Sequence, residues 1–86
     1  MAERPAAARL TLYSRQYCHL CAEMRAALLP LCREFGLDLD EIDVDSDPEL
    51  ERRYNELVPL LVHQGRELAR WRLDAAAVRV YLSEIS

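Results

Sequence analysis

Lysine is absent from this 86-residue chain, glycine occurs only twice, and phenylalanine and tryptophan occur once each. Without lysine, 11 arginines carry the basic side-chain charge against 15 acidic residues, for a net charge of −4. Proteins that bind nucleic acid through its phosphates need a basic surface. The composition therefore predicts no nucleic-acid partner.

Long apolar segments are also missing from the sequence. No run approaches the roughly 18–20 apolar residues of a membrane span. Residues 1–9 lack the apolar core of roughly 7–15 residues that a signal peptide needs. These absences predict a cytoplasmic protein without membrane contact. The chain length fits one domain, which we place at residues 10–86 after a flexible arm at residues 1–9, and we expect a monomer.

Cysteine occurs three times, and two of the three form the C-x-x-C motif Cys18-His19-Leu20-Cys21. A reducing cytoplasm does not favour a structural disulfide framework, so this spacing indicates either a redox site or a zinc site. Zinc takes four ligands, whereas Cys18, Cys21 and His19 supply three. We therefore expect no metal site. Cys32, about three turns further along a predicted helix, is interpreted as a packing residue.

The first half of the chain predicts a strand, a helix and a second strand. Leu10 to Tyr13 alternates as a half-buried strand does. Helical steps of three and four separate the next apolar residues, Cys18, Cys21, Met24, Leu28, Leu31 and Phe35. Gly36, directly after Phe35, favours the end of this helix. Residues 37–44 predict a second strand. Its alternation slips between Leu39 and Ile42, which indicates a late start or a bulge.

The second half predicts a helix, two strands and a final helix. Ser46-Asp47-Pro48-Glu49 combines the cap, proline and acidic residue of a helix start. Residues 58–62 and 67–71 predict strands joined by a tight turn. Asp74 caps a last helix with one side formed by Ala75, Val78, Leu82 and Ile85. The order β-α-β-α-β-β-α predicts a compact α/β fold, with a mixed four-stranded sheet and helices on both faces.

The position of the C-x-x-C motif favours redox chemistry. Cys18 follows a strand and a loop and stands at the start of a helix, where unpaired N–H groups and the helix dipole stabilise a thiolate. A thiolate is the attacking species in disulfide exchange, so Cys18 is the candidate nucleophile. Cys21 lies one turn further and faces the core. We expect it to resolve the mixed disulfide, since two cysteines at this spacing can reach disulfide geometry.

The residues around the motif resemble a known family. An aromatic residue, a serine and a basic residue precede the C-x-x-C of glutaredoxins, as in Leu12-Tyr13-Ser14-Arg15-Gln16-Tyr17-Cys18-His19-Leu20-Cys21. Val58-Pro59, followed by an apolar strand, is similar to the Val-Pro step of glutaredoxins and thioredoxins. The run from Asp45 to Pro59 resembles a group of small bacterial glutaredoxin-like proteins. The resemblance covers residues 10–85.

This resemblance implies a thioredoxin-like fold and a thiol–disulfide oxidoreductase that acts on protein disulfides or glutathione mixed disulfides. It implies no bound cofactor, with glutathione as a candidate reductant. Arg15 takes the place of the basic residue that steadies the thiolate or a glutathione carboxylate. Val58 takes the place of the residue whose backbone pairs with the thiol partner. Pro59 takes the place of the cis-proline that faces the cysteines.

Two further residues flank the nucleophile. Tyr17 either packs beside the thiol partner or closes the loop. His19 is expected to favour the thiolate of Cys18 electrostatically.

The sequence also departs from the glutaredoxin pattern. The Gly-Gly step that usually follows the fourth strand is missing from Leu68-Ala69-Arg70-Trp71-Arg72, and His-Leu replaces the usual Pro-Tyr between the cysteines. Glutathione dependence is therefore open. Two other functions also stay open, a binding or adaptor module that keeps the fold without turnover and a carrier of an iron–sulfur cluster.

Overall fold

Four strands and three α-helices follow one another in the predicted order across residues 8–85, the part of the chain that the computed structural model describes. The elements are β1 (Arg9–Ser14), α1 (His19–Phe35), β2 (Asp38–Asp43), the short 3-10 turn η2 (Val44–Ser46), α2 (Pro48–Tyr54), β3 (Leu60–His63), β4 (Arg66–Arg70) and α3 (Ala75–Ile85). Residues 1–7, most of the predicted N-terminal arm, lie outside the described residues. No helix within residues 8–85 is both long and apolar enough to cross a membrane.

The sheet is mixed, with the strand order β2-β1-β3-β4. β1 and β2 are parallel, and α1 connects them because parallel neighbours require a long crossover. β3 is antiparallel to both β1 and β4. Leu60 at the start of β3 pairs with Tyr13 near the end of β1. The loop before β3 and the loop after β1 therefore lie at the same end of the sheet.

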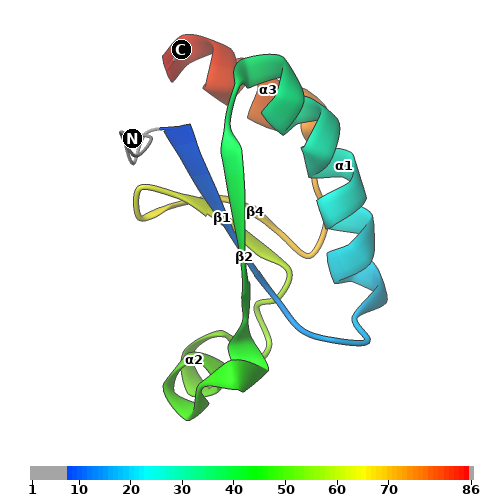
Figure 1. Cartoon of the computed structure of the whole chain (residues 1–86), viewed down its shortest axis with the longest axis vertical. Helices are drawn as coiled ribbons and strands as arrows, with labels where there is room; N and C mark the ends of the chain where they lie inside the picture. The colour runs from blue at the N-terminus through cyan, green and yellow to red at the C-terminus, as the bar shows by residue number, and fades with distance from the viewer. Residues whose placement is uncertain (1–7, 86) are drawn as a thin grey trace, which may run out of the picture.

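The two faces of the sheet are covered unequally (Figure 1). Alternate residues of β1, Leu10 and Leu12, are fully buried against α1 and α3, where the core lies. The opposite face meets α2 through the rings of Tyr13 and Tyr54, which stack with centroids 4.2 Å apart. The prediction of helices on both faces is confirmed.

The helix α1 carries the site and is defined at both ends. Cys18 is its N-cap residue, and Gly36 ends it in the left-handed conformation at φ 66°, which glycine adopts without a Cβ clash. Four residues of the predicted apolar stripe are buried, Cys21, Met24, Leu28 and Leu31, and so is the neighbouring Cys32, whereas Cys18 and Phe35 are partly exposed. This stripe fixes α1 on the sheet and so fixes the position of its first turn.

Several details of the strands and of α3 differ from the sequence prediction. β2 pairs with β1 over six consecutive residues without a bulge, and the irregularity lies instead in the pairing of β3 with β4, between Leu61 and Val62. β3 begins at Leu60 rather than at residue 58, because Pro59 has no N–H to donate to a strand ladder. In α3, Val78 and Leu82 are buried, whereas Ala75 and Ile85 are exposed.

Candidate active site

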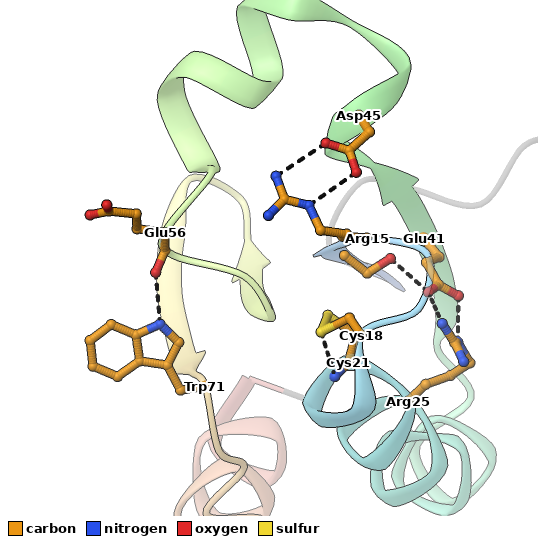
Figure 2. The surroundings of a disulfide bond; sticks show 9 residues. Arg15, Cys18, Cys21, Arg25, Glu41, Asp45, Glu56 and Trp71 are labelled. Carbon is orange, nitrogen blue, oxygen red and sulfur yellow. Dashed lines mark hydrogen bonds and ion pairs between the residues drawn. A yellow bond between two sulfur atoms is a disulfide. The ribbon is translucent and has the colours of Figure 1, made fainter.

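The C-x-x-C pair lies at the N-terminus of α1 and forms a disulfide, with the Cα atoms of Cys18 and Cys21 5.2 Å apart. Cys18 has an extended backbone and caps the helix, so its Sγ accepts a hydrogen bond from the Cys21 amide at 3.1 Å (Figure 2). Its carbonyl accepts a second bond from the Ala22 amide at 3.1 Å. Cys18 is partly exposed and Cys21 is fully buried. An incoming group can therefore reach the first sulfur more readily than the second.

The electrostatic environment favours a negative charge on Cys18. The first turn of α1 contains no acidic residue, and the amide that bonds the Cys18 sulfur is one of the unpaired donors at the helix start. His19 is 89 % exposed and its Nε2 lies 3.2 Å from Glu23 one turn further along. Its predicted influence on Cys18 stays a prediction.

Arg15 holds neighbouring segments together. Its guanidinium donates to both carboxylate oxygens of Asp45, at 3.0 and 3.1 Å, and to Oδ1 of Asn55 at 2.5 Å. Figure 2 shows the guanidinium aimed at Asp45 rather than at the disulfide. These bonds link the loop after β1 to η2 and to the end of α2. The predicted contact of Arg15 with a thiolate or a glutathione carboxylate stays a prediction, and it would require Arg15 to exchange partners.

Val58 and Pro59 form the predicted cis peptide bond. Pro59 is buried and Val58 is partly exposed. The sheet register places this segment at the same end of the sheet as the loop that leads to Cys18, because Leu60 pairs with Tyr13. The topology thus brings the two predicted halves of the site to one end of the sheet.

Apolar side chains are exposed beside the motif. Tyr17 is fully exposed in a left-handed conformation at φ 58°, and Leu20 is 37 % exposed. Leu20 also lines a cavity of about 270 Å³ with Trp71 and Arg72, between α1 and the segment after β4. A second cavity, of about 630 Å³, lies on the α2 face at Tyr13 and contains no cysteine. The surface beside the motif is therefore partly apolar.

A charged cluster beside the active-site loop was not expected from the sequence. Ser14, which is buried, donates to Oε2 of Glu41 at 2.7 Å. Arg25 of α1 also donates to both oxygens of Glu41. The hydrogen bond from Arg25 lowers the pKa of the Glu41 carboxyl against the opposing effect of burial. No local sequence signal marks this cluster, because it depends on the register of β1 with β2 and on the packing of α1 against the sheet.

The Glu41 cluster predicts a pH-dependent stability. Because the pKa of Glu41 is lowered in the folded protein, its contribution is present above the unfolded value of roughly 4.3 and is lost as the pH falls through the folded value. We expect Glu41→Gln to lower the free energy of unfolding by about 1 kcal/mol at pH 7 and by less at pH 3. Urea titrations at the two pH values measure this difference.

The matched control is Glu34→Gln. Glu34 pairs with Arg79, and both side chains are about half exposed, so its loss should cost at most about 0.5 kcal/mol. Equal losses at pH 7 and pH 3 for Glu41→Gln would show that the carboxylate charge is not what stabilises the fold.

Cys32 and His63 both have structural positions. Cys32 is 5 % exposed and belongs to the core, as expected, and burial, followed by the charge of Asp38, raises the pKa of its thiol. His63 is buried and its Nδ1 lies 2.7 Å from the hydroxyl of Tyr81. Among residues 8–85, no three His, Cys, Asp or Glu side chains are grouped so that they could hold a metal ion.

Trp71 lies next to the active-site region but matches no motif of the sequence. It follows β4 in a left-handed conformation at φ 66° and is 50 % exposed. Neither periodicity nor a motif marks it, because its contacts are with a segment more than ten residues earlier in the chain. Figure 2 shows its indole directed at Glu56.

Comparisons with known proteins agree with this geometry. The profile of the family described as "Glutaredoxin-like domain (DUF836)" matches residues 9–83. The chain is 29 % identical over 76 residues to an uncharacterized protein of Mycobacterium tuberculosis, covering 83 % of this chain and 78 % of that protein.

Solved structures extend the comparison. A protein from X. campestris is 36 % identical with a TM-score of 0.70, covering 87 % of this chain and 96 % of that one. Protein Ne2328 from Nitrosomonas europaea is 35 % identical with a TM-score of 0.73, covering 94 % and 98 %. A thioredoxin from Fasciola hepatica is 17 % identical with a TM-score of 0.60, covering 91 % and 80 %, a likeness of fold. The family profile, the two structural relatives and the Cys18–Cys21 disulfide lead to one assignment: this chain belongs to the glutaredoxin-like family, with a thioredoxin-like fold.

Proposed function

We propose that the protein is a thiol–disulfide oxidoreductase in which Cys18 is the nucleophile and Cys21 the resolving thiol. One observation carries this proposal. The outer sulfur of the pair caps a helix and accepts an amide hydrogen bond, and the inner sulfur is buried within bonding distance of it. The first feature stabilises an attacking thiolate. The second allows Cys21 to attack Cys18 and release the substrate from the mixed disulfide. The family membership is consistent with such a role.

The reaction begins with the reduced protein. The Cys18 thiolate attacks one sulfur of the substrate disulfide, so a mixed disulfide forms and the other substrate sulfur leaves as a thiolate that takes a proton from solvent. Cys21 then loses its proton and attacks the sulfur of Cys18. This step re-forms the Cys18–Cys21 disulfide and releases the second substrate thiol. Two electrons pass from the protein to the substrate, and an external thiol such as glutathione, or a reductase, returns them.

Polypeptide disulfides are the substrates that the surroundings of Cys18 favour. Tyr17 and Leu20 expose apolar side chains next to the two cysteines. Glutathione would need cations for its two carboxylates; Arg15 is held by Asp45 and Arg70 by Glu67 at 2.7 Å, which leaves Arg72 beside Leu20 as the cation for one of them. We therefore infer that a protein segment is the better substrate, with the backbone of Val58 pairing with it as an added strand would.

The ionisation of Cys18 tests the proposal. After reduction, the Cys21→Ser variant should react with iodoacetamide at Cys18 with a midpoint below the roughly 8.5 of a free thiol. Cys32 serves as the internal control, because its buried thiol should react only on unfolding. A Cys18 midpoint at 8.5 or above would favour the adaptor function instead. Mass spectrometry of quenched samples across a pH series distinguishes the two outcomes.

A further inference from the structure

Trp71, the sole tryptophan of the chain, has a conformation that a bulky residue rarely adopts. Its φ is 66°, and the Arg72 amide donates to the Arg70 carbonyl across it at 2.7 Å. A hydrogen bond from i+2 to i around a residue with positive φ defines a rare and strained γ-turn. Such strain persists only where neighbouring contacts hold the residue in place.

Two hydrogen bonds join Trp71 to the segment Glu56–Pro59. The Trp71 amide donates to the Pro59 carbonyl at 2.8 Å. Its indole Nε1–H donates to the Glu56 carbonyl at 2.9 Å (Figure 2). One residue thus bonds both ends of the short segment that includes Val58. The two bonds come from different parts of the residue, and the γ-turn is what directs both toward this segment.

Burial does not account for this arrangement. Half of the Trp71 side chain is exposed, so the ring contributes less to the core than a buried aromatic residue does. Arg70 lies over the ring, with Cζ 5.6 Å from its centroid, and also pairs with Glu67. The hydrogen bond to Glu56 and the contact with Arg70 therefore orient a ring that is only half buried.

We propose that Trp71 is a positioning residue, which fixes the segment Glu56–Pro59 so that the Val58 backbone is ready to pair with a polypeptide substrate. The proposal rests on the oxidoreductase function proposed above and adds a determinant of its substrate class. Since the indole points at Glu56 and not at the disulfide, Trp71 takes no part in the chemical steps. By fixing this segment before the substrate arrives, Trp71 reduces the conformational entropy that is lost when a peptide binds. A small disulfide that does not pair with Val58 gains nothing from it.

The experiment compares two substrates in two variants. Trp71→Phe keeps a ring but removes the indole donor, and Trp71→Gly removes the ring while allowing the left-handed backbone. The substrates are a peptide joined by a disulfide to a small chromogenic thiol and bis(2-hydroxyethyl) disulfide. We expect both variants to raise KM for the peptide by about three- to ten-fold, the effect of one lost hydrogen bond. The kcat for the peptide and the rate with the small disulfide should stay within about two-fold.

The matched control is Leu29→Ala, which shortens a side chain of similar exposure, 46 %, on α1. It should change neither substrate's kinetics. The proposal is overturned if both Trp71 variants match the wild type on the peptide, or if they lose rate on both substrates in equal proportion. Failure of the oxidoreductase function is a different result, because the wild-type protein would then reduce neither substrate.

Discussion

Cys18→Ser should lower the rate of peptide disulfide reduction by at least about 10³-fold, the scale on which removal of a nucleophile acts in enzymes. A serine hydroxyl at the same N-cap would still accept the Cys21 amide, so the helix start should keep its cap. The hydroxyl does not ionise near neutral pH and cannot attack a disulfide. The measurement is kcat/KM for a peptide mixed disulfide at pH 7, with unfolding by urea as the check on folding.

Two companion variants separate the roles of the cysteines. Cys32→Ser should keep the rate, because Cys32 packs in the core and burial raises the pKa of its thiol. Cys21→Ser should stop the reaction after the first step, so that a covalent complex between Cys18 and the peptide accumulates and is visible by mass. Trapping of the peptide on Cys21 in the Cys18→Ser variant would reverse the assignment.

The sequence predicted those parts of the fold that depend on local signals. The spacing of Cys21, Met24 and Leu28 marked the buried face of α1, and Gly36 marked its end. Asp74 caps α3 as expected, with its Oδ1 accepting from the Ala77 amide at 3.1 Å. These signals act over a few residues, so they can be recognised without knowing which strands pair.

Features that depend on long-range pairing could not be predicted in this way. The Arg25–Glu41–Ser14 cluster joins three elements, and Trp71 bonds a segment 15 positions earlier. The resemblance to glutaredoxins located Arg15 in the sequence but did not reveal its partner Asp45. A bulge can also be assigned to the wrong strand, because alternation describes one strand and not its register with a neighbour.

The position of the active site depends on the packing of α1 in the core, and two adjacent leucines of α1 test this dependence. Leu28 is fully buried in the cluster between α1, the sheet and α3, whereas Leu29 is 46 % exposed on the same helix. We expect Leu28→Ala to lower the free energy of unfolding by about 3 kcal/mol, within the roughly 2–5 kcal/mol seen for buried leucines. Leu29→Ala should change it by no more than about 0.5 kcal/mol. Urea titrations followed by Trp71 emission measure both.

This difference bears on function because α1 presents Cys18 only while its apolar face is packed on the sheet. A chain of this size has a small core, and a loss of about 3 kcal/mol is a large share of a typical stability of roughly 5–15 kcal/mol. Leu28→Ala should therefore lower activity at temperatures where the wild type remains folded, in proportion to the folded fraction, with the alkylation midpoint of Cys18 unchanged in the folded molecules. Equal destabilisation by the two substitutions would mean that the stripe of α1 is not what holds Cys18 in place.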